Sequence, residues 1–298
     1  MKGGHASRTA EYMALFRALE SSRRPARTRL FEDAFAYQFL RRSLRAVVWL
    51  SRLPLGSSPV AWFIDWRWPG ARASGVARTR LIDDAVVDAL REGAEQVVIL
   101  GAGFDCRAYR IPGIERTRVF EVDRPATLAA KRERLERMLG ALPDHVAFVE
   151  IDFNRQGLAD VIEGAGFAVR ARTFFVWEGV TNYLAGEAVD ATLRYLASIG
   201  APGSRIIFTY IHPTVLRDPA AFAGARKSAS VVERVGERWT FGIDPATLST
   251  YLAERGLALI NDVGSLEYRA RYMKPSGPHM TGYEFYRAAL AEIRAPGP

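Results

Sequence analysis

Apolar residues follow two different rhythms along the chain, and the change comes near residue 78. Residues 10–52 carry apolar side chains at helical spacing, with no alternating segment between them. Residues 53–69 are rich in proline, glycine and tryptophan, which predicts a turn-bearing connector or a pocket wall. Its aromatic side chains are expected to pack the helices onto the core rather than to contact a substrate directly. We therefore expect a helical N-terminal cap over residues 1–75.

From residue 78 onward, short apolar runs alternate with helical segments, which indicates a parallel sheet covered on both faces. The predicted strands are Gln96–Leu100, Arg118–Val122, His145–Ile151, Thr173–Trp177, Arg205–Tyr210 and Leu257–Val263. Tyr283–Tyr286 is expected as a final antiparallel edge strand. Residues 212–240 are expected to form a polar, helical insertion that could cover the strand ends as a lid. The predicted fold class is α/β, a doubly wound and mostly parallel sheet over residues 76–298.

The composition is that of a globular protein. Apolar residues make up 49% and charged residues 25% of the 298 positions, which fits neither a disordered chain nor a fibre. The longest apolar runs are far shorter than the roughly 20 residues that span a bilayer. Residues 1–10 lack the apolar core of a signal peptide. We therefore expect no membrane partner and a cytoplasmic location.

The number of cysteines and the distribution of charge bear on whether the protein binds a metal or a nucleic acid. The single cysteine leaves no disulfide framework and no cysteine-rich zinc site, and no metal site is predicted. The net charge of +8 comes almost entirely from arginines, which are scattered instead of gathered on one face or tail. A nucleic-acid partner is therefore not expected, and a small-molecule substrate is.

The strongest local motif joins an apolar strand directly to a glycine turn, Leu-Gly101-Ala-Gly103-Phe-Asp. Glycines let the backbone turn sharply and approach a ligand closely. A dinucleotide-binding turn would continue with a third glycine, but the chain has Cys106 followed by the bulky Arg107. The motif therefore favours a methyl donor, which has no pyrophosphate, over NAD. An NAD-dependent oxidoreductase is the alternative enzyme.

Acidic side chains stand at the ends of the next three strands. Asp123 follows the glycines by about 20 residues, where a carboxylate can accept both ribose hydroxyls, with Glu121 on the same face. It could also cap the next helix. Asp152 could accept from the adenine amino group, and Phe153 could pack on the base. Glu178 lies where the amino group of the donor's methionine would sit, or it is an ordinary acid at a helix start.

Five runs of the chain resemble the leucine carboxyl methyltransferase family. They are Ala77-Arg78-Thr79-Arg80-Leu-Ile-Asp83-Asp84, Leu-Gly-Ala-Gly-Phe-Asp, Glu-Val-Asp-Arg-Pro, Ile-Asp-Phe and Trp-Glu-Gly-Val-Thr-Asn-Tyr-Leu. The resemblance is strong over residues 75–210 and closest to bacterial methyltransferases and polyketide O-methyltransferases that use S-adenosyl-L-methionine. It implies a class I, Rossmann-like methyltransferase fold with S-adenosyl-L-methionine as cofactor.

The resemblance also implies roles in the donor site. Arg78 pairs with the methionine carboxylate, with Arg80 as its rival. The remaining donor contacts are Gly101 and Gly103 at the turn, Asp123 at the ribose, Asp152 and Phe153 at the adenine, and Glu178 at the amino group. The family's common Leu-Met-Tyr motif is replaced here by Val180-Thr181-Asn182-Tyr183. The family's substrate contacts are therefore not assigned to residues of this chain.

Methyl transfer from a sulfonium requires few catalytic side chains, because the methyl group is already an activated electrophile that needs alignment and exclusion of water. A carboxylate acceptor needs no base, whereas a phenol gains from one. The candidate bases are His212, Tyr183 and Tyr210. We expect O-methylation of a small-molecule carboxylate or phenol, with the carboxylate slightly ahead. A non-catalytic sensor that binds the donor is the alternative from another class.

Overall fold

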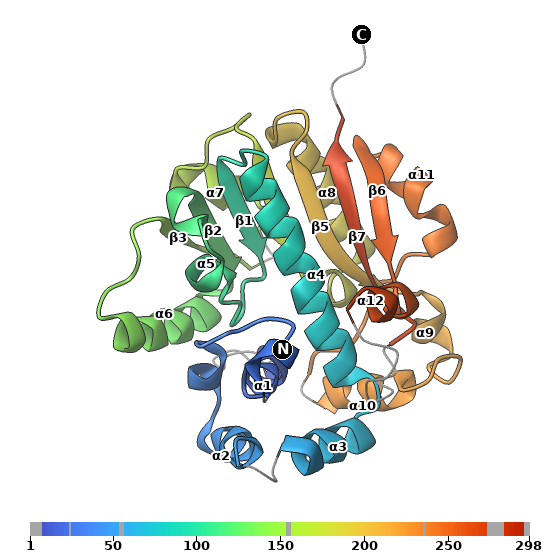
Figure 1. The fold of residues 1–298 in the computed structure, drawn as a ribbon. Helices are drawn as coiled ribbons and strands as arrows, with labels where there is room; N and C mark the ends of the chain where they lie inside the picture. Colours follow the sequence, from blue (N-terminus) through green and yellow to red (C-terminus); the bar gives the residue numbers. More distant parts are fainter. Residues whose placement is uncertain are drawn as a thin grey trace.

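A seven-stranded sheet forms the core of the molecule (Figure 1). The computed structural model describes residues 8–23, 25–53, 57–152, 156–234, 236–272 and 283–294. The strands are β1 (Gln96–Leu100), β2 (Arg118–Asp123), β3 (Val146–Glu150), β4 (Thr173–Trp177), β5 (Arg205–Ile211), β6 (Leu257–Val263) and β7 (Tyr286–Ile293). Their order in space is β3-β2-β1-β4-β5-β7-β6. All neighbours are parallel except β7, which runs antiparallel to β5 and β6. The predicted doubly wound, mostly parallel sheet is confirmed.

The last strand differs from its prediction. We expected a short edge strand at Tyr283–Tyr286, but β7 begins at Tyr286 and lies between β5 and β6, so β6 is the edge. Small side chains such as Ala288, Ala289 and Ala291 are buried along β7, which lets an inner strand pack closely on both faces. The other six strands begin and end within one residue of their predicted bounds.

Helices cover both faces of the sheet. Outside the insertion after β5, the helices of the α/β part are α4 (Ala71–Arg91), α5 (Arg107–Arg110), α6 (Pro125–Leu139), α7 (Ala159–Ile162), α8 (Gly186–Ile199), α11 (Leu248–Ala253) and α12 (Ser265–Tyr272). Because strand side chains alternate between faces, Ile99 packs in one cluster with Ile82 of α4. Its neighbour Val98 packs in another cluster with Leu193 of α8. No helix of the described residues is long and apolar enough to cross a membrane.

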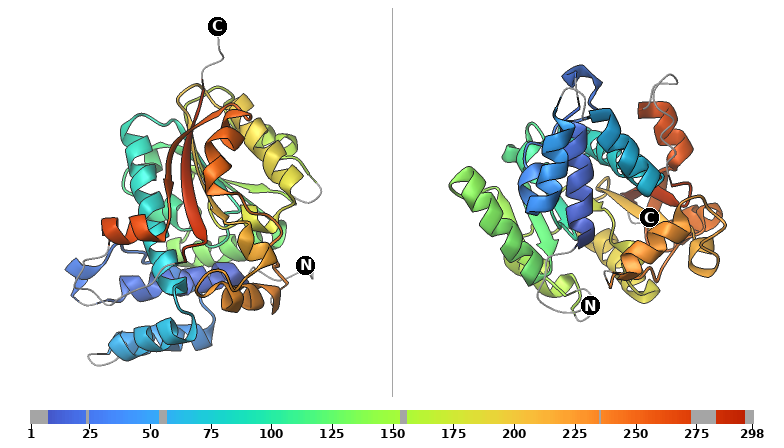
Figure 2. Two further views of the ribbon diagram at one scale, coloured as in Figure 1. Left: turned by 90° about the vertical axis from the view of Figure 1, so that its right-hand side faces the viewer. Right: turned by 90° about the horizontal axis from the view of Figure 1, so that it is seen from below.

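The N-terminal helices lie below the carboxyl ends of the parallel strands (Figures 1 and 2). They are α1 (Arg8–Ser21), α2 (Arg42–Ser51) and α3 (Ser57–Arg67). Every residue of α1 from Ala14 to Glu20 is buried, because the helix lies between the sheet and α2. The helix α4 runs without a break from residue 71 to residue 91 and thus passes through the predicted boundary between residues 75 and 76.

The segment predicted as a connector is mostly helical. Residues 57–67 form α3, and Pro59 is tolerated there because the N–H groups of a first helical turn have no partner within the helix. Trp62 and Trp66 are 67% and 62% exposed, so the expectation that they pack the cap onto the core is wrong. Trp68, one residue past the helix end, is half-buried.

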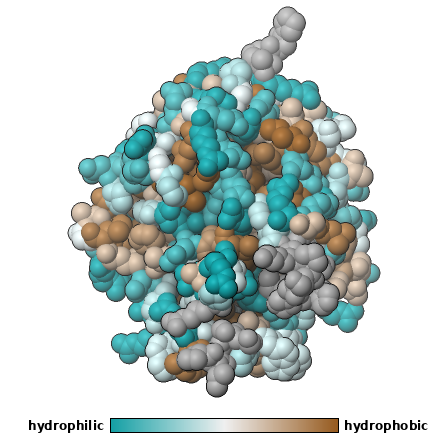
Figure 3. Space-filling view, in the orientation of Figure 1, coloured by the Kyte–Doolittle hydropathy of each residue, from teal (hydrophilic) through white to brown (hydrophobic). Residues whose placement is uncertain are grey.

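The insertion after β5 contains two short helices, α9 (Thr214–Arg217) and α10 (Ala225–Arg234). Figure 1 shows α10 below the carboxyl ends of the strands. The face of the molecule seen in Figure 3 is largely hydrophilic, with apolar residues in separate groups.

A buried ion pair joins β2 to α6 and gives a stability prediction. The side chains of Glu121 and Lys131 are both fully buried, and Nζ of Lys131 lies 2.8 Å from Oε2 of Glu121. Replacement of Lys131 by Met leaves the carboxylate buried without its counter-ion, which we expect to lower the free energy of unfolding by about 3–5 kcal/mol in urea titrations. The double variant Lys131→Met/Glu121→Met should recover most of this loss. If Lys131→Met lowers the free energy of unfolding by less than about 1 kcal/mol, which is the range of surface ion pairs, Glu121 and Lys131 do not form a buried ion pair.

Candidate functional site

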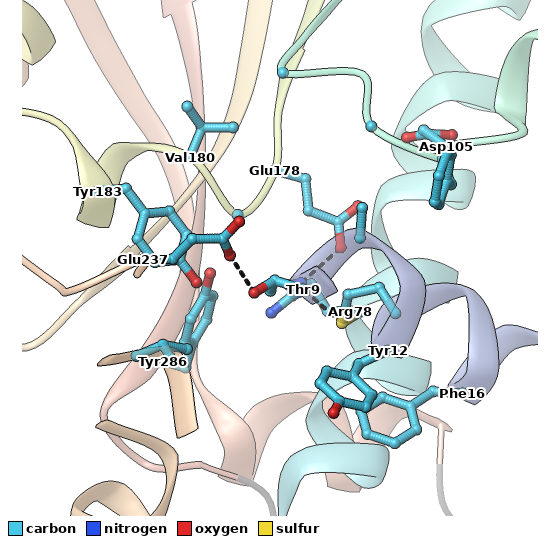
Figure 4. A pocket seen from close by; sticks show the side chains of 18 of the residues that line it. Thr9, Tyr12, Phe16, Arg78, Asp105, Glu178, Val180, Tyr183, Glu237 and Tyr286 are labelled. Atoms are coloured by element: carbon cyan, nitrogen blue, oxygen red, sulfur yellow. Dashed lines mark hydrogen bonds and ion pairs between the residues drawn. The ribbon is translucent and has the colours of Figure 1, made fainter. Parts of the chain in front are cut away.

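A cavity of about 330 Å³ lies at the carboxyl ends of β1, β2 and β4. The strand order reverses between β1 and β4, and open α/β sheets bind ligands at such a switch point. Residues of α1 and of the insertion close the cavity from below, and Figure 4 shows their side chains around it. The strand ends form one wall, which we call the donor half. The other wall, the acceptor half, is formed by side chains of α1 and by Trp68, Tyr183, Ser228, Val231, Val232, Glu237, Trp239, Tyr283 and Tyr286.

The glycine turn lines the donor half, and both glycines have backbone conformations that favour glycine. The φ angles are +67° at Gly101 and +44° at Gly103. A Cβ at Gly101 would lie 2.2 Å from Cγ2 of Val180, and one at Gly103 would lie 3.3 Å from Cβ of Ala10 in α1. The turn is therefore pressed against protein on these sides. The glycines are required for packing, as well as for any close approach of a ligand.

Asp123 fixes the glycine turn from the end of β2. One carboxylate oxygen accepts from the backbone N–H of Gly103 at 2.6 Å, and the other from the N–H of Arg124 at 2.6 Å. Burial raises the pKa of Asp123, although the two N–H donors oppose this shift. Asp123 lines the cavity, whereas Glu121 is paired with Lys131 in the core and does not line the cavity.

Glu178 lies between two arginines at the end of β4. Its Oε1 accepts from Nε of Arg78 at 2.7 Å and its Oε2 from Nη1 of Arg107 at 2.8 Å. Burial would raise the pKa of Glu178, but the charges of Arg107 and Arg78 outweigh it and hold the pKa below its ordinary value. Each carboxylate oxygen has a further lone pair, so an ammonium group could still bind here. The two residues expected at the methionine end of the donor thus meet in one ion pair.

Arg78 has further contacts that point its guanidinium along the cavity. Its charge lies 4.7 Å from the centre of the Tyr286 ring, and its Nη2 lies 3.6 Å from Sδ of Met13. Its rival Arg80 bonds instead to Asp84 and to the carbonyl of Leu30. The structure therefore places Arg78 at the cavity and Arg80 outside it.

Behind this wall, a chain of buried ion pairs connects the donor half to α1 and α4. Its links join Arg78 to Glu178, Glu178 to Arg107, Arg107 to Asp105 and Asp83, Asp83 to Arg110, Arg110 to Asp33, and Asp33 to Arg17. Arginines and carboxylates are equal in number along this chain, so the charges balance. Burial raises the pKa of Asp105, but Arg107, Lys131 and Arg17 lower it to about 2. We call these residues the buried ion-pair chain.

Most members of the buried ion-pair chain were not predicted from the sequence. Arg107 entered only as a bulky residue that excludes a third glycine, yet it is 2% exposed and bonds three carboxylates. The available signal was an arginine placed directly after the turn in an apolar stretch, since a buried arginine needs acidic partners.

The acceptor half is mainly aromatic and apolar. Tyr12 and Phe16 of α1 lie across the cavity from Tyr183 and Tyr286 (Figure 4). Met13 and Trp239 also line the cavity. The hydroxyl of Thr9 bonds to the carboxylate of Glu237, which joins α1 to the end of the insertion (Figure 4). Among the described residues, this wall has one other charged side chain, Arg17, which is already paired with Asp33.

Comparison with known proteins identifies the family. The profile of the leucine carboxyl methyltransferase family matches residues 10–197. The chain belongs to this family. This confirms the resemblance drawn from the five sequence runs, and with it the family's cofactor, S-adenosyl-L-methionine; it disfavours the oxidoreductase alternative.

Several bacterial relatives are each provisionally named an S-adenosyl-L-methionine-dependent methyltransferase. One from Mycolicibacterium smegmatis is 37% identical over 199 residues, 62% of each chain. One from Mycolicibacterium paratuberculosis is 35% identical over 57% of this chain and 52% of its own. One from Streptomyces coelicolor is 34% identical over 75% of each. The chain thus matches about half to three quarters of these relatives' lengths.

Solved structures support the fold. A provisionally assigned methyltransferase from Thermobifida fusca is 18% identical with a TM-score of 0.57, over 95% of this chain and 94% of its own. A DUF574 family protein from Streptomyces avermitilis is 15% identical with a TM-score of 0.57, over 94% and 97%. The predicted class I methyltransferase fold is confirmed by these likenesses.

Of the three candidate bases, only Tyr183 lines the cavity. The hydroxyl of Tyr210 donates to Asp262 at 2.9 Å, and Tyr210 is fully buried. His212 packs on Phe222, and its Nδ1 accepts from the backbone N–H of Thr214 at 3.2 Å. The structure therefore places Tyr210 and His212 outside the lining of the cavity. Burial, with the nearby Tyr286 and Glu237, raises the pKa of Tyr183, which makes it a poor base.

The adenine side of the family's donor site is described in part. Asp152 lines the cavity, and its backbone N–H donates to the side chain of Gln156 at 3.1 Å. Phe153 lies outside the described residues. Arg124, next to Asp123, also lines this side.

The contact between the glycine turn and Val180 gives a double-mutant test. Gly101→Ala should cost about 1–2 kcal/mol for the left-handed conformation and a further 1–3 kcal/mol, roughly, for the overlap with Val180. Gly113 has φ of +89°, and a Cβ added there would have nothing within 4 Å, so Gly113→Ala reports the backbone cost alone.

The overlap should disappear in Gly101→Ala/Val180→Ala, read as a coupling energy against the single variants in urea unfolding. Equal costs for Gly101→Ala and Gly113→Ala would show that the turn is not pressed against Val180.

Proposed function

We propose that the protein is a cytoplasmic O-methyltransferase that transfers the methyl group of S-adenosyl-L-methionine to an oxygen of a small molecule, a phenol or a carboxylate. The observation that supports this most is the division of one cavity into two unlike halves. The donor half carries charged residues at the strand ends, and the acceptor half carries aromatic residues from the cap and the insertion. A polar, zwitterionic donor and a largely apolar acceptor would each find matching walls.

The proposed donor contacts follow from the placement of each residue. Glu178 would bind the amino group of the methionine and Arg78 its carboxylate, since the two lie together at the end of β4. Asp123, already held by the turn, would accept from the ribose hydroxyls. Asp152, with Phe153, would hold the adenine beyond it.

Transfer needs alignment more than acid–base chemistry. The oxygen of the acceptor forms a bond to the methyl carbon while the carbon–sulfur bond breaks, and the electron pair of that bond neutralises the sulfonium. S-adenosylhomocysteine then leaves with the methylated product. The contribution of the chain is to hold both reactants in line and to exclude water. The Thr9–Glu237 bond between α1 and the insertion supports such an enclosed site.

The charge of the acceptor half favours a phenol over a carboxylate, a change from the order that the sequence suggested. A carboxylate acceptor would lie near the carboxylate of Glu237, and like charges in a closed site repel. Arg17, the one cation that the described residues contribute to this wall, is already paired with Asp33. A phenol can instead donate its proton toward Glu237. This carboxylate, with Thr9 as its neighbour, is the residue we propose as the base.

Acceptor pairs of one skeleton, such as a naphthol and the matching naphthoate, separate the two acceptor classes. We expect methylation of the phenol, and a loss of about 10²–10⁴-fold in single-turnover rate for Glu237→Gln. The residual rate should rise with pH towards the phenol pKa of about 10, because the acceptor must then ionise unaided. His212→Ala is the matched control and should behave as the parent.

Ester formation on the naphthoate, unchanged by Glu237→Gln, would reject the phenol assignment. Tight binding of S-adenosyl-L-methionine with no turnover across a broad acceptor panel would support the sensor alternative and reject the enzyme.

A further inference from the structure

The underside of the cap carries an exposed aromatic patch. Six large apolar side chains of α2, of the residues just after it and of α3 are between 43% and 67% exposed, namely Trp49, Leu50, Leu53, Trp62, Phe63 and Trp66. They are six of the ten exposed large apolar side chains of the described residues. We call them the aromatic patch.

The two helices that carry the patch pack against each other. Figure 2 shows the two helices side by side when the molecule is seen from below. The rings of Trp62 and Trp66 stack, with centroids 6.4 Å apart, and Phe63 lies 6.0 Å from Trp66. Scattered exposed apolar residues are ordinary, but a gathered patch of this kind marks an interaction surface.

The chain around the patch is strongly basic. Residues 34–64 contain four arginines and no aspartate or glutamate. Arg45 precedes Trp49 by one helical turn and so lies on the same side of α2. It also lines a cleft of about 370 Å³ between α2 and α6, together with Gln38, Arg134 and Arg137. We call this the arginine cleft.

The arginine cleft concentrates positive charge. Burial, together with the charges of Arg137 and Arg45, lowers the pKa of Arg134, against the opposite effect of Glu11 and Glu133. Arg137 has one carboxylate partner, Glu133, at 3.2 Å on the exposed face of α6. No acidic side chain lines the cleft among the described residues. An anion in the cleft would relieve the mutual repulsion of the three guanidinium groups.

The charge pattern selects the partner of this face. In a symmetric dimer the same surface meets itself, so a second copy would bring the arginines of both copies together. An anionic lipid surface matches both the aromatic patch and the arginine cleft. Tryptophan is favoured at the boundary between headgroups and hydrocarbon, and arginines bind the lipid phosphates. We propose, against the expectation from the sequence of no membrane partner, that the face formed by α2, α3 and the arginine cleft docks on a membrane that contains anionic lipid, with the aromatic patch in the interface.

The proposal is independent of the acceptor, so its test uses binding alone. The full-length protein is floated with vesicles of phosphatidylcholine, and with vesicles that contain phosphatidylglycerol as about a third of the lipid. We expect partitioning onto the anionic vesicles at least tenfold above that onto the neutral ones, and a marked loss in about 0.5 M salt, where surface charges are screened.

Two variants separate the two components of the surface. Trp62→Ser/Trp66→Ser and Arg134→Gln/Arg137→Gln should each lower partitioning about tenfold or more. Their matched controls lie elsewhere on the surface. Ile260→Ser/Leu266→Ser removes two other exposed apolar side chains, and Arg91→Gln/Arg116→Gln removes two exposed arginines. Both controls should partition as the parent, and circular dichroism confirms the fold of each variant.

The proposal is overturned if the parent does not bind anionic vesicles, or if all variants bind equally. It is also overturned if light scattering shows a dimer that Trp62→Ser/Trp66→Ser separates while no vesicle binding occurs. A second copy of the chain would then be the occupant of the patch.

Discussion

The burial of the Arg107 guanidinium is the constraint on which the site depends. A charge at 2% exposure is tolerated only when opposite charges surround it, and Arg107 meets this need with Asp83, Asp105 and Glu178. These three carboxylates come from α4, from the glycine turn and from the end of β4. One side chain therefore ties together the three segments that form the donor half. The same requirement makes the arrangement specific, since removal of any partner would leave a buried charge unbalanced.

The cap and the α/β part are joined by the same chemistry. Arg17 of α1 bonds to Asp33 and donates to the carbonyl of Phe104, just after the glycine turn. Gly103 leaves room for Ala10 of α1 at the turn itself. The helix that covers the cavity is thus held by the charge of Arg17 and by close packing at Ala10. A cap attached in this way forms part of the site rather than a separate appendage, as the unbroken α4 also indicates.

Much of the framework could be predicted from the sequence, because strands buried on both faces leave long apolar runs with clear ends. The strand-end acids Asp123 and Glu178 were found for the same reason, since position at a strand end is a local property. The helix α3 was missed because its proline and tryptophans are typical of loops, although a proline in the first turn is compatible with a helix.

Other features depended on distant contacts. Nothing near Tyr210 in the sequence indicates that its hydroxyl bonds to Asp262. Nothing near His212 indicates that its ring packs on Phe222. Glu237 gained its importance only when the fold brought the end of the insertion against Thr9. The partners of Arg107 are separated from it by as many as 71 positions, so pairing of this kind could not be assigned from spacing. β7 was misplaced because its alanines resemble neither an alternating nor a fully apolar strand.

On the proposed function, the cavity binds S-adenosyl-L-methionine through Asp123 and the buried charges around it. Isothermal titration calorimetry with S-adenosylhomocysteine and with NAD, on the parent and on Asp123→Ala, tests it most directly. We expect S-adenosylhomocysteine but not NAD to bind the parent, and the binding free energy to fall by about 1–3 kcal/mol in the folded Asp123→Ala variant. Binding of NAD, or an affinity for S-adenosylhomocysteine that Asp123→Ala leaves unchanged, would contradict it.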